Sequence, residues 1–394
     1  MKKGKPPQGE DLADGIIPAI SYEAPLPQKK VFLPWHLPRK QYVRQHQWCS
    51  QIERLLKDSR PADGILKYLG LPGTDLLDLR FFHSQLCSAH KVRFRFLGFN
   101  TSAMPKSKDH TEMNISLDEV RRLPYVDPMS DVIPDNFVLL AKENSLACKR
   151  TRELGPYDVV NLDLCDGFGA HRPAPTPTPT PTTSYYDAVS AILALQARSK
   201  TPWLLLLTTR ADKANIDSNI LKTLLQKYVE NLESCAPFRD ASREQFALET
   251  ELAIRKAAAT PDGLLSIFLT GLCKWLLGLA LACQPPVVLE LRSVIGYRVN
   301  GASTHEDLIS LALRFTPTFV PAKDPLGLAK GPVAAPNECT LSSHIVRRVA
   351  KRIDADKRLR EDDALNRSMI EGTAQLLALA RYNVEEYRKW ARGH

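Results

Sequence analysis

The sequence of 394 residues lacks the motifs that mark several common enzyme classes. It has no G-x-S-x-G elbow, no Walker loop and no H-E-x-x-H helix, so neither a hydrolase nor an ATPase is indicated. No C-x-x-C pair occurs, and His36 and His46 have no Cys or carboxylate partner at the spacing of metal ligands. We therefore expect no metal ion.

The sequence also lacks the pattern of a secretory signal. The first fifteen residues carry charge, and no apolar run of the length that a signal needs follows them. The eight cysteines are scattered, and most lie in apolar segments where a reduced thiol packs as a small hydrophobic side chain. These features predict a cytoplasmic location.

One long apolar run, residues 263–283 (GLLSIFLTGLCKWLLGLALAC), tests the expectation of a soluble protein. Its length suits a bilayer, but Lys274 near its centre would cost roughly 2.5–3.5 kcal/mol on insertion. We expect a buried helix whose lysine reaches an edge of the core, and no membrane partner.

The formal net charge of +9 would favour phosphate-rich partners if the cations shared one face. In residues 31–60 a helix is expected to begin after Pro38, and it carries Arg39, Lys40, Arg44 and Trp48. Cations mixed with aromatic rings can bind phosphates and stack on bases, so these four are candidate nucleic-acid-binding residues. The alternative is a solvated helix whose aromatic rings dock on a sheet.

The composition divides the chain into segments. We expect a flexible leader (1–30), a basic aromatic helical segment (31–60), a Rossmann-like domain (61–320), a linker (321–340) and a helical tail (341–394). Inside the domain, residues 171–184 form a Pro/Thr-rich insertion and residues 212–283 a helical one. The tail, with Ser343 as a cap, would suit a protein partner.

The domain has the alternating rhythm of an α/β fold. Expected strands are KVRFRFLGF (91–99), NFVLLA (136–141), YDVVNLDL (157–164) and WLLLLT (203–208), and expected helices are SLDEVRRL (116–123), 145–154 and 185–196. Residues 287–299 and 307–319 should pair as a terminal antiparallel hairpin. The fold class predicted is a doubly wound Rossmann-like sheet with helical N- and C-terminal appendages.

Ligands of such sheets bind at the carboxyl ends of the strands. In YLGLPGTDLLDLR (68–80), Gly70 and Gly73 permit close backbone approach, and Asp78 follows. Either residues 66–71 are the first strand, with LPG as the cofactor loop, or DLLDLR is that strand with LPG ahead of it. The sequence does not decide between these two strand assignments. The glycines could equally belong to an ordinary turn with no ligand.

Two further strand ends carry polar side chains. Asn100 follows RFRFLGF, where an acidic residue usually accepts hydrogen bonds from a ribose diol. Asp163 and Asp166 lie at the end of the apolar run YDVVNLDLCDG, together with a flexible glycine. We take Asp163 and Asp166 as the catalytic candidates, and Gly70, Gly73, Asp78 and Asn100 as the cofactor-binding candidates.

The stretches YDVVNLDLCDGFG, SYYDAVSAILAL and PWLLLLTTRAD resemble class I S-adenosylmethionine-dependent methyltransferases, and most closely the tRNA guanine N2-dimethyltransferases. The resemblance implies S-adenosylmethionine as cofactor and a nucleic acid as methyl acceptor. It also implies that Asp163 faces the amine that is methylated, with residues 208–212 closing the next strand.

The sequence departs from that family at three places. It has no G-x-G after an acidic first-strand residue, it has Asn100 in place of an acid, and Leu164 and Cys165 replace a proline and an aromatic ring. An inactive methyltransferase-fold subunit that binds nucleic acid or protein is therefore the alternative to an enzyme.

Overall fold

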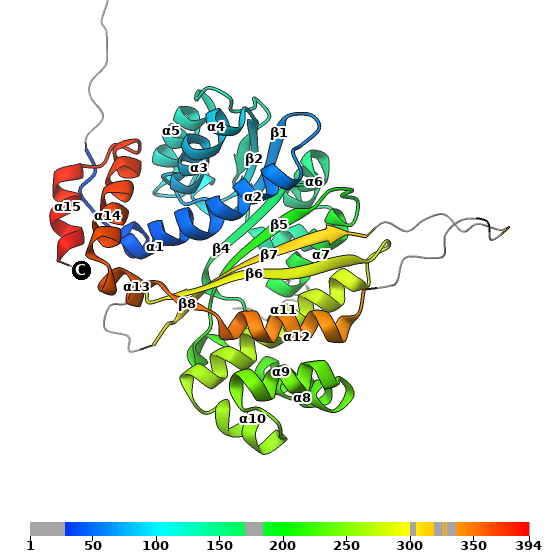
Figure 1. Cartoon of the computed structure of the whole chain (residues 1–394). Coiled ribbons are helices and arrows are strands. Elements are labelled where there is room, and N and C mark those ends of the chain that lie inside the picture. The colour runs from blue at the N-terminus through cyan, green and yellow to red at the C-terminus, as the bar shows by residue number, and fades with distance from the viewer. Residues whose placement is uncertain are drawn as a thin grey trace, which may run out of the picture.

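The computed structural model describes residues 28–169, 184–299, 305–318, 326, 328 and 336–393. These residues form an α/β fold in which one mixed sheet lies between helices (Figure 1). Nearly all of the expected leader, the Pro/Thr-rich insertion and most of the expected linker lie outside the described residues.

The described part of the chain contains one eight-stranded sheet in the order β3-β2-β1-β4-β5-β7-β6-β8. The strands are β1 (Ile65–Gly70), β2 (Arg93–Phe99), β3 (Asp131–Ile133), β4 (Val159–Gly167), β5 (Trp203–Arg210), β6 (Val287–Tyr297), β7 (Leu308–Pro317) and β8 (Ile353–Asp354). Neighbouring strands pair in parallel except at β7, which is antiparallel to both β5 and β6. The expected terminal hairpin is confirmed.

Apolar side chains cover both faces of the sheet. In β5, Leu205 and Leu207 belong to one core cluster, and Leu204 and Leu206 belong to the other. Because successive side chains of a strand point to opposite faces, an uninterrupted leucine run fits a central strand covered on both sides.

The helices of the N-terminal half are α1 (Pro38–Val43), α2 (Ser50–Asp58), α3 (Leu77–Phe82), α4 (Ser88–His90), α5 (His110–Arg121), α6 (Leu146–Leu154) and α7 (Tyr185–Gln196). A π-helical segment, η2 (Arg44–Cys49), joins α1 to α2 into one continuous helical stretch. The helix expected after Pro38 and the helices at 145–154 and 185–196 are confirmed.

The helices of the C-terminal half are α8 (Ser218–Ser234), α9 (Ala236–Phe246), α10 (Glu251–Ala257), α11 (Pro261–Leu281), α12 (Glu338–Ala350), α13 (Ala355–Glu361), α14 (Asp363–Ala378) and α15 (Val384–Arg392). Figure 1 shows α8, α9 and α10 beyond α11 and α12, on the side of the molecule away from α1 and α2.

Local sequence signals explain where several helices begin. The hydroxyl of Ser145 accepts a hydrogen bond from the Cys148 amide, and Ser184 forms a capping box with Asp187. The expected cap at Ser343 is wrong. That residue lies inside α12, and the side chain of Asn337 caps the helix instead.

Two short segments correct the predicted elements. Residues 136–141, expected as a strand, contain the 3₁₀-helix η5 (Phe137–Ala141), whereas the third strand is the preceding Asp131–Ile133. DLLDLRFF contains α3, so β1 is the first strand and LPG follows it, which settles the register that the sequence left open.

The long apolar helix α11 is a core helix of this fold. By length and composition it could cross a membrane, but 67% of its most apolar window is buried inside the protein. Lys274 extends from this helix and pairs with Glu338 at the start of α12. The expectation of a buried helix with a lysine at the edge of the core is confirmed.

The C-terminal tail is more than an appendage, which corrects the sequence-based expectation. Helix α12 packs against α9, α11 and β6, and its Ile345 and Val349 belong to one of the two cores of the sheet. Helices α13 and α14 pack against α1 (Figure 1). The tail also supplies β8, the last strand of the sheet.

Two cysteines depart from the expectation of scattered, reduced thiols. Cys235, before α9, and Cys339, in α12, are joined in a disulfide, and their Cα atoms lie 5.7 Å apart. The two residues are separated by 104 positions, so no local spacing in the sequence indicated the pair.

Candidate functional site

The strand order creates a crevice beside β1. Strand β1 lies between β2 on one side and β4 on the other, so the connections that follow β1 and β3 lead in opposite directions across the sheet. In open α/β sheets ligands bind outside the carboxyl ends of the strands at such a switch point. The structure has a cavity of about 830 Å³ there.

Four strand ends contribute to the wall of this switch-point cavity. They supply the loop after β1 with Gly73, the loop after β2 with Asn100, the turn after β3 with Asp135, and Asp163 of β4. The volume falls within the range of about 300–1,000 Å³ that is typical of small-molecule sites. Four of the six expected catalytic and cofactor-binding residues therefore meet here, namely Gly73, Asp78, Asn100 and Asp163, together with Arg44, which was expected to bind nucleic acid.

Aromatic rings line one part of the cavity. Phe99 and Phe137 are buried and make an edge contact with 6.3 Å between ring centroids. Tyr185, at the start of α7, lies 6.2 Å from Phe137 by the same measure. These rings offer a planar apolar group a surface between the ends of β2 and β4.

The two glycines after β1 have different roles. A Cβ atom on Gly73 would meet nothing within 4 Å, so a side chain there would enter open space in the cavity. A Cβ on Gly70 would lie 2.6 Å from the ring of Tyr68, and Gly70 does not line the cavity. The expectation of a cofactor role for Gly70 is thus corrected, because this glycine makes room for a buried ring.

Asp78 lies in the first turn of α3 and is bound by a cation from the N-terminal helix. The Nε atom of Arg44 donates to Asp78 Oδ1 over 2.6 Å, and both side chains are at least nine-tenths buried. The carboxylate gains this hydrogen bond and the opposite charge, which together offset its removal from water.

The side-chain amide of Asn100 makes two hydrogen bonds to the backbone of neighbouring loops. Its Nδ2 atom donates to the carbonyl oxygen of Pro72, and its Oδ1 atom accepts from the amide of Ser102. Asn100 therefore ties the loop after β2 to the loop after β1. The Oδ1 atom keeps a second lone pair, so the expected hydrogen bond from a ribose stays a prediction.

Asp163 forms an ion pair with Lys40, whose Nζ atom lies 2.5 Å from Asp163 Oδ1. The lysine is 4% exposed, and its ammonium group also lies 4.5 Å from the centre of the Trp48 ring. Burial is the largest single effect and lowers the pKa of Lys40, but the nearby Asp163, Tyr297 and Asp78 together outweigh it and raise that pKa to about 12. The lysine is therefore charged at neutral pH.

The four candidate nucleic-acid-binding residues do not form an exposed surface. Lys40, Arg44 and Trp48 are buried, and Trp48 donates through Nε1 to the hydroxyl of Ser310 on β7. Arg39 is occupied by Asp356, 3.0 Å away. This placement corrects the nucleic-acid-binding interpretation of these four residues, because their charges and rings face the sheet and the C-terminal helices.

One expected catalytic residue cannot be placed. Asp166 belongs to β4, but its side chain lies outside the described residues. Beyond it, the amide of Phe168 donates to the hydroxyl of Thr209 on β5, which fixes the end of the strand.

Several cavity residues were missed by the sequence analysis. Lys29, Asp75 and Tyr382 line the cavity together, and Lys29 pairs with Asp75 and with Glu112. The hydroxyl of Tyr382 donates to Asp75 over 2.7 Å. Asp75 and Tyr382 are 307 positions apart, so only the tertiary fold reveals that they share a wall.

The cavity carries an excess of negative charge. Its lining includes six carboxylates (Asp75, Asp78, Asp109, Glu112, Asp135, Asp163) and three cations (Lys29, Arg44, Lys108), a formal charge of −3. Lys40 and Arg381 pair with Asp163 and Glu112 from outside the lining and reduce this excess, and the negative charge that remains favours a ligand that carries a positive charge.

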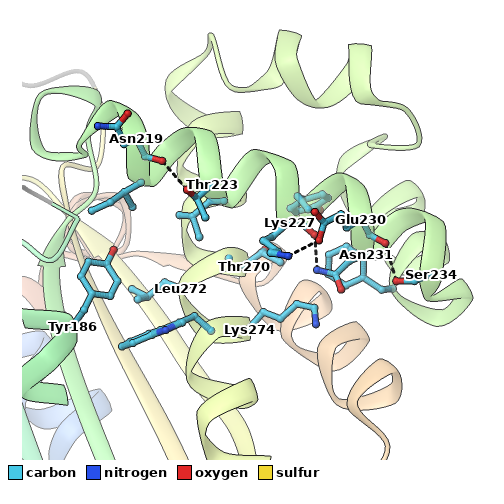
Figure 2. A pocket seen from close by; sticks show the side chains of 16 residues that line it. Tyr186, Asn219, Thr223, Lys227, Glu230, Asn231, Ser234, Thr270, Leu272 and Lys274 are labelled. Carbon is cyan, nitrogen blue, oxygen red and sulfur yellow. Dashed lines mark hydrogen bonds and ion pairs between the residues drawn. The ribbon is translucent and has the colours of Figure 1, made fainter. Parts of the chain in front are cut away.

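A second cavity, of about 690 Å³, lies between α8 and α11 (Figure 2). Tyr186, Leu272 and Trp275 give it an apolar wall. Its two lysines are both paired, Lys227 with Glu230 inside the cavity and Lys274 with Glu338 outside it. Its lining therefore offers apolar surface without the strand-end carboxylates that make the switch-point cavity the candidate site.

No cluster of three or more His, Cys, Asp or Glu side chains in the described part of the chain is arranged to hold a metal ion.

Comparison of the chain with known proteins assigns it to a family. No curated protein matches the chain. A family model described as PP_RS20740-like matches residues 29–392, which include the whole described sheet and every helix that packs on it. The chain belongs to the PP_RS20740-like family.

Proposed function

We propose that the switch-point cavity binds S-adenosylmethionine and that the chain is a methyltransferase-like protein of the doubly wound, Rossmann-like kind. The observation that carries the proposal is the cavity itself, which collects Gly73, Asn100, Asp135 and Asp163 from four strand ends at one edge of the sheet. An antiparallel hairpin that follows the parallel strands, as β6 and β7 form beside β5, is common in class I methyltransferases and supports the resemblance found in the sequence.

The residues present fit the cofactor in size, shape and charge. The open space beside Gly73 allows a ligand to approach the backbone after β1, and Phe99 and Phe137 suit a planar base. The excess of carboxylates suits a molecule with a sulfonium and an ammonium group. When bound, S-adenosylmethionine supplies an already activated methyl group, so the protein needs chiefly to position the acceptor.

Asp163 is the residue proposed to orient an acceptor. Its Oδ1 atom is bound by Lys40, and its side chain remains 23% exposed toward the cavity. A carboxylate in this position accepts hydrogen bonds from an amine and stabilises the positive charge that develops as the amine is methylated.

A second candidate function is a binding subunit that holds the ligand without turnover. One observation favours it: Lys40 already occupies the carboxylate expected to meet the acceptor. A nucleic-acid partner remains a proposal that rests on the net charge of +9, and the helical segment of Lys40 and Arg44 is not its surface. A cytoplasmic location likewise stays a prediction.

Calorimetric titration with S-adenosylmethionine and S-adenosylhomocysteine tests cofactor binding. We expect saturable binding by the natural chain and its loss in Gly73→Val, whose new side chain would fill open cavity space. Gly278→Val is the control, because Gly278 lies on the exposed side of α11 and is absent from the cavity lining. Absence of binding at millimolar ligand would refute the proposal.

Transfer of a labelled methyl group separates the enzyme from the binding subunit. The protein is incubated with methyl-labelled S-adenosylmethionine and unmodified tRNA, and the label is measured in the RNA and in the protein. Transfer that Asp163→Ala abolishes supports an enzyme. Tight cofactor binding with no transfer to RNA or protein favours the binding subunit.

A further inference from the structure

Arg44 is a buried cation with one donor group left without a partner. The residue is 2% exposed, and its Nε atom is held by Asp78 at 2.6 Å. Its Nη1 atom is fully buried and has no hydrogen-bond partner among the residues that the structure describes. A guanidinium carries five N–H donors, and leaving the two of Nη1 unsatisfied in a buried place is costly.

The position of Arg44 shows where a partner could come from. Arg44 lines the switch-point cavity beside Gly73, Leu77 and Asp78, although it belongs to the N-terminal helical segment. The residue starts the π-helical segment η2, and such segments occur frequently at functional sites. Asp78 holds one edge of the guanidinium, so the fork is already oriented before a ligand arrives.

The chemistry of the surroundings selects the kind of partner. An unsatisfied guanidinium calls for an anionic oxygen pair, which a carboxylate or a phosphate could supply. The cavity carries a formal charge of −3, and Lys29 is already neutralised by Asp75 and Glu112. A single carboxylate on a molecule that also carries positive charge fits this field better than a phosphate does.

We propose that Arg44 binds the carboxylate of the ligand in the switch-point cavity and thereby selects a ligand with an intact amino-acid group. The inference rests on the proposed function, in which that ligand is S-adenosylmethionine. Arg44 is then a specificity residue that comes from outside the sheet and its loops.

The test compares S-adenosylmethionine with decarboxylated S-adenosylmethionine, which keeps the sulfonium and the ammonium groups. Calorimetric titration of the natural chain should give about 10- to 100-fold tighter binding of the ligand with the carboxylate, the range expected for charged hydrogen bonds in a buried site. In Arg44→Lys, which keeps a charge beside Asp78 but loses the fork, that preference should fall by about tenfold. Affinity for the decarboxylated ligand should change by no more than about twofold.

Two further variants guard against an effect on folding. Arg44→Met combined with Asp78→Asn removes both buried charges, so neither is left alone, and should bind the two ligands with affinities within about threefold of each other. Arg39→Met lies on the same helical segment but pairs with Asp356 away from the cavity, so it should keep the natural preference. Melting curves without ligand show whether each variant is folded.

These titrations distinguish a failure of the proposed role of Arg44 from a failure of the proposed S-adenosylmethionine binding. If the natural chain binds both ligands equally well, or if the Arg44 variants weaken both ligands by the same factor, the cavity binds its ligand but Arg44 does not read the carboxylate. If the natural chain binds neither ligand, the proposed cofactor is wrong and the inference is wrong with it.

Discussion

At the scale of single residues, the helical segment from α1 to α2 turns a polar stripe toward the protein interior. Lys40, Arg44, Gln47 and Gln51 recur at the spacing of one helix face, and all four are buried. Burying such groups is unfavourable unless partners compensate for the lost water. Asp163, Asp78 and the serines of β6 and β7 supply partners to the first three.

Removal of the Lys40 charge tests how much the ion pair with Asp163 contributes to the free energy of unfolding. Lys40→Met leaves Asp163 largely buried without its cation, so we expect the free energy of unfolding in urea to fall by about 2–4 kcal/mol. The double variant Lys40→Met with Asp163→Leu should lose less than the single one, since no charge is then left unpaired. The exposed pair of Lys227 and Glu230 is the control, and Lys227→Met should cost less than about 1 kcal/mol. Equal losses at the two lysines would contradict this account.

His36 predicts a pH dependence of stability. Burial and the nearby Arg44 lower the pKa of this fully buried histidine from 6.5 to about 4. The unfolded chain therefore takes up the proton first, so stability is complete above pH 6.5 and declines as the pH falls toward 4. Between pH 7 and pH 5 the natural chain should lose about 2 kcal/mol more than His36→Asn, whose side chain does not titrate. Parallel urea curves at both pH values measure the difference.

At the scale of secondary structure, the sequence pattern located the long elements and missed the short ones. The apolar runs of β4 and β5 and the terminal hairpin are visible in the sequence because their burial sets their composition. The three-residue strand β3 carries too little pattern to be recognised, and NFVLLA has the composition of a strand although it forms η5. Tertiary packing rather than local preference decided that segment.

Two glycines of α11 provide a matched pair at this scale. A Cβ on Gly263 would lie 2.2 Å from the backbone oxygen of Ala257, so Gly263→Ala should destabilise the protein although alanine favours helices. A Cβ on Gly278 would meet nothing within 4 Å, and Gly278→Ala should stabilise it by up to about 1 kcal/mol. Melting temperatures that shift in opposite directions would support the close contact between α11 and the end of α10, and a rise in both would contradict it.

At the scale of the whole molecule, the candidate site is assembled from segments far apart in the chain. Gly73, Asn100 and Asp163 could be found in the sequence because each follows an apolar strand, and parallel strands end at one edge. Arg44 and Tyr382 could not be placed there, since Arg44 comes from the N-terminal helical segment and Tyr382 from the connection between α14 and α15 near the other end of the chain. Backbone hydrogen bonds from Lys29 to Arg381 and from Asn383 to Lys29 join those ends beside the cavity.

The union of the two ends leads to a last prediction, on truncation. A chain that ends at residue 337 loses Ile345 and Val349 from one core of the sheet and Met369 and Tyr387 from the other. Because each fully buried apolar side chain contributes about 1.5–3 kcal/mol, the loss of several exceeds the usual stability of a domain. We expect the truncated chain to show no cooperative melting transition and to be largely insoluble.

Deletion of residues 173–183, the Pro/Thr-rich run, is the control for this truncation. Its composition predicts a solvated loop, so the melting temperature should stay close to that of the natural chain. A truncated chain that melts cooperatively within a few degrees of the natural one would mean that α12 to α15 are a separable appendage. If it melts only in the presence of an added peptide of residues 338–393, the two parts complete one core, as the packing of α12 on β6 and of α14 on α1 indicates.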